Sequence, residues 1–168
     1  MNVKYEHKGE LTLIGFSATI APGEGFEKCP KFWDEEYNRK YARLWQTGVP
    51  QNDVEQALLT HQIGMYAACL CNGNGFEYWI AGEYKGGRVP EGLKLCTLPE
   101  SDWAVFTAHG PLPGSLQSLN MEIWQSWLPQ VKDQYEVNGD NSIEYYTVGD
   151  QTGPDYECGM WVPIRKKA

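Results

Sequence analysis

The chain of 168 residues contains an internal repeat. Residues 16–18 (FSA) recur as residues 106–108 (FTA), and residues 76–77 (FE) recur as residues 156–157 (YE). In each half a strand pattern is followed by a helical pattern and then by two further strand patterns. This order predicts an α+β fold in which two pseudo-symmetric strand–helix–strand–strand repeats form one curved antiparallel sheet. We expect both helices on one face of that sheet and a ligand cleft on the other.

Hydrophobic periodicity places the individual elements. The CNGNG segment at 71–75 is typical of a hairpin turn between two strands. We expect strands at residues 11–20, 63–70, 76–84, 93–99, 102–110, 143–148 and 156–164, and helices at 29–45, 54–59 and 115–129.

The last strand pattern, DYECGMWVPI over residues 155–164, alternates between an apolar side and a mixed side. The mixed side places Glu157, Gly159 and Trp161 in a row, where solvated polar residues are the usual choice. We expect this side to face the cleft, with Gly159 leaving space for a flat ligand beside Glu157. The other side is expected to pack beneath the helices, and it consists of Tyr156, Cys158, Met160, Val162 and Ile164.

The repeat extends the predicted cleft to further acidic and aromatic residues. The full set of candidates combines carboxylates with ring faces, which suits an organic cation, since one cation–π contact contributes about 0.5–2 kcal/mol. Each glutamate is also compatible with a simply solvated position, and each ring with ordinary packing. In addition to the three residues of the last strand, the candidates are Glu77, Trp79, Tyr66, Glu144 and Tyr146.

Charge and cysteine content exclude several classes of function. The net charge of −8 argues against direct nucleic-acid binding and favours cationic ligands. The five cysteines show neither a disulfide framework nor a zinc-ligand spacing, so we expect reduced thiols, a cytoplasmic location, no metal and no cofactor. Neither a secretory signal nor an apolar run of membrane-spanning length is present, so no membrane partner is expected.

Several segments resemble a known family. The runs WAVFTAHGPLPGSLQSLNMEIWQSWLP and IEYYTVGDQTGPDYECGMWVPI are similar to GyrI-like effector-binding domains, the ligand domains of many AraC-type and MerR-type multidrug regulators. LTLIGFSATI, CPKFWDEEY and YWIAGEY resemble the integron-cassette branch of that superfamily. The resemblance implies a single domain over residues 1–168, with half-repeats of about 1–92 and 93–168, that binds a lipophilic, often cationic small molecule.

One position departs from the family pattern. Members commonly carry an acid four residues before the proline of the last strand, and Gly159 stands there in this chain. Glu157 lies two residues away on the same expected face, and Glu144 matches the acid that often opens the preceding strand. Both are therefore candidate counter-ions for a ligand.

The sequence leaves three classes of function open. Because no helix-turn-helix pattern precedes the first strand, we expect a stand-alone effector-binding protein for small amphipathic molecules, with oligomerisation as an option. The alternatives are a hydrolase of reactive cyclopropane-type compounds, with Glu157 as a buried acid or base, and a modulator of a protein partner such as a topoisomerase. No nucleophile motif or phosphate loop accompanies Glu157, and His109 falls at a strand end, so we expect binding rather than catalysis.

Overall fold

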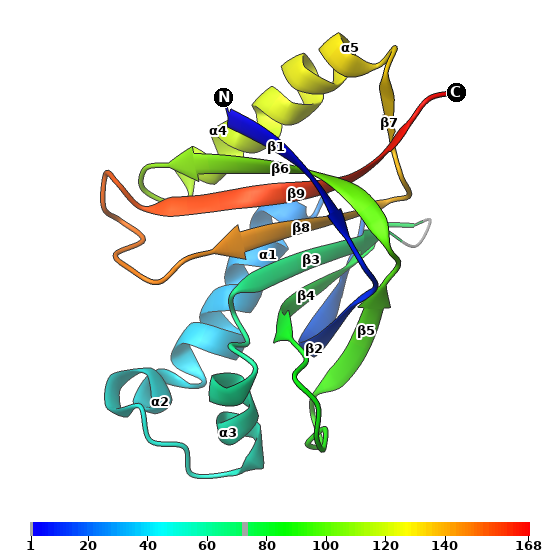
Figure 1. Ribbon diagram of the computed structural model, residues 1–168. Coiled ribbons are helices and arrows are strands. Elements are labelled where there is room, and N and C mark those ends of the chain that lie inside the picture. Colours follow the sequence, from blue (N-terminus) through cyan, green and yellow to red (C-terminus); the bar gives the residue numbers. More distant parts are fainter. Residues whose placement is uncertain (1, 72–73) are drawn as a thin grey trace. The chain divides into compact units, whose positions relative to one another are not determined.

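The computed structural model describes residues 2–71 and 74–168 (Figure 1). Its chain divides into two compact units, which are described separately below. The inner unit comprises Leu11–Leu98, and the outer unit combines Met1–Glu10 with Pro99–Ala168. Each unit contains antiparallel strands with helices packed on one face.

The inner unit follows the predicted strand–helix–strand–strand order and adds one strand. Its sheet has the order β3-β4-β2-β5, and every pair is antiparallel. A π-helical segment, η1, continues α1 directly. The elements are β2 (Leu11–Ile20), α1 (Gly25–Trp33), η1 (Asp34–Arg39), α2 (Ala42–Thr47), α3 (Asp53–Thr60), β3 (Tyr66–Cys71), β4 (Phe76–Glu83) and β5 (Lys94–Leu98).

Local chemistry defines the short helices of the inner unit. Gly48 ends α2 with a φ of 70°, a left-handed conformation that glycine adopts without steric cost. The Asn52 side chain caps α3 by accepting a hydrogen bond from the Glu55 backbone N–H at 2.9 Å. The buried Glu55 carboxylate then pairs with the guanidinium of Arg43, which joins α2 to α3.

The outer unit repeats the same order of elements with its own strands. Strands β1, β6, β9 and β8 lie side by side in that order, and β7 pairs with the end of β9. Its long helix also contains a π-helical segment, η2. The elements are β1 (Asn2–Lys8), β6 (Ser101–His109), α4 (Gly114–Glu122), η2 (Ile123–Trp127), α5 (Leu128–Val131), β7 (Tyr135–Val137), β8 (Asn141–Tyr146) and β9 (Glu157–Lys166).

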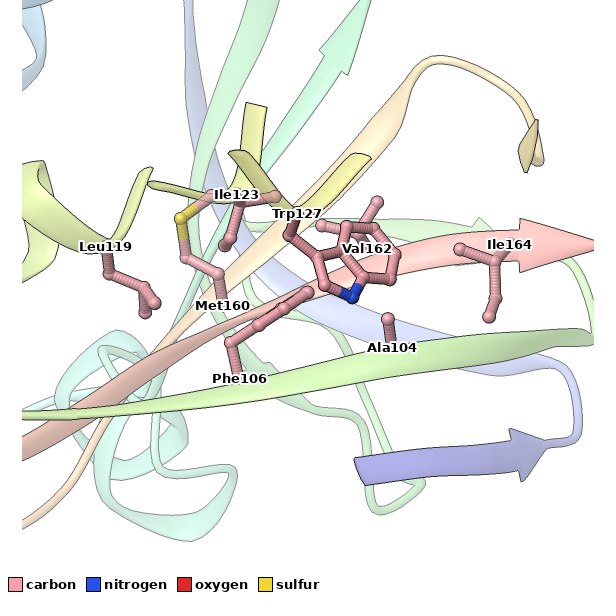
Figure 2. Close-up of a cluster of buried hydrophobic side chains, with 8 residues drawn as sticks. All are labelled: Ala104, Phe106, Leu119, Ile123, Trp127, Met160, Val162 and Ile164. Carbon is pink, nitrogen blue, oxygen red and sulfur yellow. The ribbon is translucent and has the colours of Figure 1, made fainter. Parts of the chain in front are cut away.

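The core of the outer unit lies between β6, β9 and the long helix (Figure 2). Phe106 and Trp127 meet edge to face, with ring centroids 4.9 Å apart, in the geometry that aromatic pairs prefer. Met160 and Val162 of β9 point into this cluster. The prediction that the sulfur-bearing and aliphatic side of the last strand packs beneath the helices is therefore confirmed.

The fold confirms the predicted α+β class and the order of elements within each repeat, and it adds strands that were not expected. β1 was not predicted, although its charged residues Lys4, Glu6 and Lys8 alternate with Val3, Tyr5 and His7. β1 belongs to the outer unit and β5 to the inner unit, so the units differ from the expected half-repeats of about 1–92 and 93–168. The β3–β4 hairpin forms as expected, although the turn predicted at 71–75 includes residues 72 and 73, which lie outside the described residues.

Candidate functional site

Trp161 lies in an aromatic cluster on the helix-free face of the outer sheet. Its ring centroid is 6.2 Å from that of Trp103 and 6.0 Å from that of Tyr145. The ammonium of Lys8 lies 4.4 Å from the Trp161 ring centroid, and it also pairs with the Glu6 carboxylate at 3.1 Å. A cation of the protein itself therefore already contacts the ring that was predicted to receive a ligand cation.

Gly159 does not leave an open space on this face. The register places Tyr145 opposite Gly159, and the tyrosine ring lies over the glycine. A Cβ at position 159 would come within 2.3 Å of Tyr145 Cε1 and 2.1 Å of the Phe106 carbonyl oxygen. The prediction of room for a flat ligand at Gly159 is therefore wrong, because a ring from the neighbouring strand fills that room.

Glu157 lies at the exposed start of β9. Its side chain is 48% exposed, and its Oε1 is 3.3 Å from Nε2 of His109 on β6. The prediction of a buried Glu157 beside Trp161, suited to acid or base chemistry, is therefore wrong. Ion pairs this exposed contribute about 0–1 kcal/mol, so Glu157 is a weak anchor for a ligand.

Glu144 and Tyr146 lie on the opposite face of the sheet from Trp161. The β8–β9 register pairs Glu144 with Met160 and Tyr146 with Cys158, and directly paired residues share a face. Both side chains therefore point to the helix side, and the expectation that they share one face with Trp161 is wrong. Apolar content pointed the other way, because the fully buried residue of β8, Ile143, shares a face with Trp161.

The Glu144 carboxylate has a distinctive electrostatic environment. Burial raises its pKa, and this rise is opposed by the Tyr146 hydroxyl, which donates a hydrogen bond to Glu144 Oε2 at 2.6 Å. Within residues 2–71 and 74–168, no lysine, arginine or histidine forms an ion pair with Glu144. A desolvated carboxylate without a cationic partner is costly for the protein alone, and it favours any cation that can reach it.

The remaining predicted residues lie together on the helix-free face of the inner sheet. The Trp79 indole is only 2% exposed, and its N–H donates to Glu77 Oε1 at 2.5 Å. Lys94 Nζ is 5.0 Å from the Trp79 ring centroid and 4.0 Å from Glu77 Oε1. Tyr66 shares this face through its pairing with Ala81, and burial raises the pKa of its hydroxyl. The charge of Glu77 and the ring face of Trp79 are thus already engaged within the inner unit.

Sequence analysis missed an aromatic group on the helix side of the inner unit. Trp33 donates its indole N–H to the Tyr78 hydroxyl at 2.7 Å, and the Trp33 and Tyr37 rings meet edge to face at 5.1 Å. The Tyr37 hydroxyl donates to the Ile63 carbonyl at 2.8 Å, and burial raises the pKa of Tyr37 to about 12. The helical spacing of Trp33, Tyr37 and Tyr41 was the signal available in the sequence.

Two further observations concern metal ligands and membrane spans. Across the described ranges, no group of three or more His, Cys, Asp or Glu side chains is arranged to hold a metal ion. None of the helices described is long and apolar enough to cross a membrane. Each unit is thus an α+β strand–helix–strand–strand repeat.

The sequence comparison identifies the family. The chain belongs to the family of integron-associated effector binding proteins, whose profile matches residues 6–164. This confirms the resemblance to the integron-cassette branch of the effector-binding domains. No curated protein matches the chain.

Solved structures show where the same fold occurs. SAV2435 bound to tetraphenylphosphonium is 22% identical, with a TM-score of 0.72 over 98% of this chain and 94% of that one. An integron cassette protein from the mobile metagenome of Vibrio cholerae is 13% identical, with a TM-score of 0.62 over 97% and 95% of the two chains. The EcmrR C-terminal domain is 10% identical, with a TM-score of 0.59 over 99% and 98%. The fold is therefore shared with a protein solved with bound tetraphenylphosphonium and with a domain of EcmrR.

Proposed function

We propose that this protein binds lipophilic organic cations as effectors, and that the Glu144 carboxylate is the counter-ion of the bound molecule. The observation that carries the proposal is the environment of Glu144. Its carboxylate is desolvated on the helix side of β8, accepts a hydrogen bond from Tyr146, and has no cationic partner in the described part of the chain. A bound cation would supply the missing charge compensation.

Three further facts support a cationic effector. The family consists of effector binding proteins. SAV2435, which has the same fold, was solved with tetraphenylphosphonium, an organic cation with four phenyl groups. The net charge of −8 attracts cations to the protein as a whole. The Tyr146 ring next to Glu144 offers apolar surface beside the charge, which suits a ligand that is both lipophilic and cationic.

The proposal is tested by isothermal titration with tetraphenylphosphonium and with the neutral triphenylphosphine oxide. Glu144→Gln keeps the shape of the side chain and removes its charge. A charge-assisted contact contributes about 1.5–3 kcal/mol, so the variant is expected to bind the cation at least about tenfold more weakly and the neutral compound unchanged.

The matched control is Glu157→Gln, which removes an exposed carboxylate from the same sheet. This control should leave the affinity for both compounds within about twofold, because solvent screens the charge. Equal affinity of Glu144→Gln and the unmodified protein for the cation, or a loss confined to Glu157→Gln, would refute the assignment of Glu144.

A further inference from the structure

A small cavity lies along α3, the short helix before β3 in the inner unit (Figure 1). Its volume of about 290 Å³ is at the lower end of the range of small-molecule sites, so it suits a ligand smaller than most drugs. The cavity is separate from the candidate site described above. It is lined by residues of α3 and of the loop after β4: Asp53, Gln56, Ala57, Thr60, His61, Gly86, Arg88 and Pro90.

His61, directly after α3, is the one buried polar residue of this cavity, and only 3% of its surface is exposed. Its Nδ1 accepts the backbone N–H of Lys85 at 3.0 Å, so in the neutral imidazole the proton is carried by Nε2. Burial, followed by the charge of Lys85, lowers the pKa of His61, which keeps the ring neutral near neutral pH. His61 is therefore a hydrogen-bond donor at Nε2 and an acceptor at Nδ1.

The Nε2–H of His61 faces the cavity. Within residues 2–71 and 74–168, this N–H has no protein acceptor, and the other ring contact of His61 is with Tyr84, at 5.4 Å between centroids. Among the same residues, no fully enclosed side-chain nitrogen or oxygen lacks a hydrogen-bond partner, so Nε2 has to be accessible. Because almost all of His61 is covered and the ring lines the cavity, the accessible nitrogen opens into it.

The donor character of Nε2 determines which ligands fit. A ring nitrogen that carries a proton has no lone pair for a metal ion, and an ammonium group would bring a second donor against it. A desolvated N–H without an acceptor is unfavourable, so the position calls for an acceptor atom. Thr60 lines the same cavity, and its hydroxyl accepts a hydrogen bond from Gln56 Nε2 at 3.1 Å while keeping its own proton to donate.

The charges around the cavity balance each other. Arg88 and Asp53 pair at 3.3 Å, with 78% and 72% of their side chains exposed. Such an exposed pair selects neither anions nor cations strongly. Ala57 and Pro90, both buried, add apolar surface to the wall. The cavity therefore selects a ligand by an acceptor atom on a small apolar body rather than by net charge.

We propose that this cavity binds a small organic molecule whose carbonyl or carboxylate oxygen accepts a hydrogen bond from the Nε2–H of His61. Carbonyl and carboxylate oxygens share the acceptor chemistry that the cavity requires, and the probes below distinguish a neutral from an anionic ligand. The apolar body of the molecule packs against Ala57 and Pro90. This site does not depend on the effector site proposed around Glu144.

The test follows the ring nitrogens of the histidines in ¹⁵N-labelled protein by long-range ¹H–¹⁵N NMR during titration with three probes. Acetophenone offers a neutral carbonyl, benzoate a carboxylate, and benzylammonium only donors. His61 is expected to carry its proton on Nε2 from the start, and its Nε2 signal should shift saturably with acetophenone, benzoate or both, and not with benzylammonium. His7 and His109, whose side chains are 60% and 59% exposed, are internal controls that should not respond.

Two variants separate the two nitrogens of His61, and ligand-observed NMR measures their affinity for the probe that binds. His61→Asn places an amide oxygen near the position of Nδ1, so it keeps an acceptor for Lys85 and removes the Nε2 donor. His61→Gln places an amide nitrogen near the position of Nε2 and keeps that donor. His61→Asn should weaken binding roughly three- to tenfold, whereas His61→Gln should stay within about twofold of the unmodified protein.

Four results would overturn the proposal. These are a proton on Nδ1 of His61, an Nε2 signal that neither oxygen probe shifts, a shift with benzylammonium, and equal affinities of the two variants. Circular dichroism verifies that both variants are folded. The spectra of the unmodified protein decide the assignment even where a variant does not fold.

Discussion

Replacement of Gly159 by alanine tests the packing between β9 and β8. An added Cβ would lie 2.3 Å from Tyr145 Cε1 and 2.1 Å from the Phe106 carbonyl oxygen. Both distances are far shorter than van der Waals contact. The Phe106 carbonyl is a backbone group, so it cannot rotate away as a side chain could. The strands β6 and β9 must therefore separate locally, and the Tyr145 ring must leave its position over the glycine.

The expected loss of stability follows from these two close contacts. Overpacking in a well-packed site costs about 1–3 kcal/mol, and two close contacts place Gly159→Ala near the upper part of that range. For a chain of this size, a loss of about 2–3 kcal/mol corresponds to a fall of roughly 4–12 °C in Tm. Tyr145→Ala combined with Gly159→Ala removes the ring obstacle and leaves the carbonyl, so the double variant should lose less than the sum of the two single losses.

The assay is urea unfolding monitored by circular dichroism. The free energies of unfolding of the unmodified protein, Gly159→Ala, Tyr145→Ala and the double variant form a double-mutant cycle. Gly9→Ala is the matched control, because no atom lies within 4 Å of its added Cβ, and it should change the free energy of unfolding by less than about 0.5 kcal/mol. If Gly159→Ala were as stable as the unmodified protein, or if the two losses were simply additive, the inferred contact between Tyr145 and Gly159 would be refuted.

Three further predictions concern the core, the pH dependence of stability and the counter-ion. Trp127→Ala should cost about 3–5 kcal/mol in urea unfolding, whereas Trp124→Ala, whose indole is 38% exposed on the same helix, should cost less than about 1 kcal/mol. Burial, followed by the charge of Lys85, lowers the pKa of His61, whose Nδ1 accepts the Lys85 N–H at 3.0 Å. At His61 the unfolded chain therefore binds a proton more readily than the folded protein does. The urea midpoint should fall as pH drops below about 6.5, and His61→Gln should make this fall smaller. Tyr146→Phe removes the hydrogen bond that lowers the pKa of Glu144, so the pH at which tetraphenylphosphonium binding is half lost should rise.

The order of elements was predictable because it depends on local periodicity. The alternation of 155–164 placed Met160 and Val162 beneath the helices, and the structure confirms this. The same reasoning failed for β8, because its one fully buried residue, Ile143, lies on the face of Trp161 and not on the helix side. Only the pairing register with β9 determines that Glu144 lies on the helix side. Register is a long-range property, and a shift of one residue would reverse every side chain.

The details of the candidate site depended on contacts that no single strand reveals. The space at Gly159 is filled by Tyr145, which is fourteen residues earlier in the chain and lies opposite it in the sheet. The strand β1 was not predicted although its charges alternate, and it provides the lysine that contacts Trp161. Both errors have the same origin, since the neighbours of a strand residue across a sheet are distant in sequence.

The repeat extends to the way each unit engages its own tryptophan, and this bears on the position proposed for a ligand cation. In the outer unit Lys8, from edge strand β1, contacts the Trp161 ring, and in the inner unit Lys94, from edge strand β5, contacts the Trp79 ring. Each lysine also pairs with a glutamate on the same face. A ligand cation at either ring would have to displace a covalently tethered lysine, whose effective concentration is high. Glu144 has no such internal partner in the described chain, so charge complementarity favours Glu144 over both tryptophans as the position for the ligand's charge.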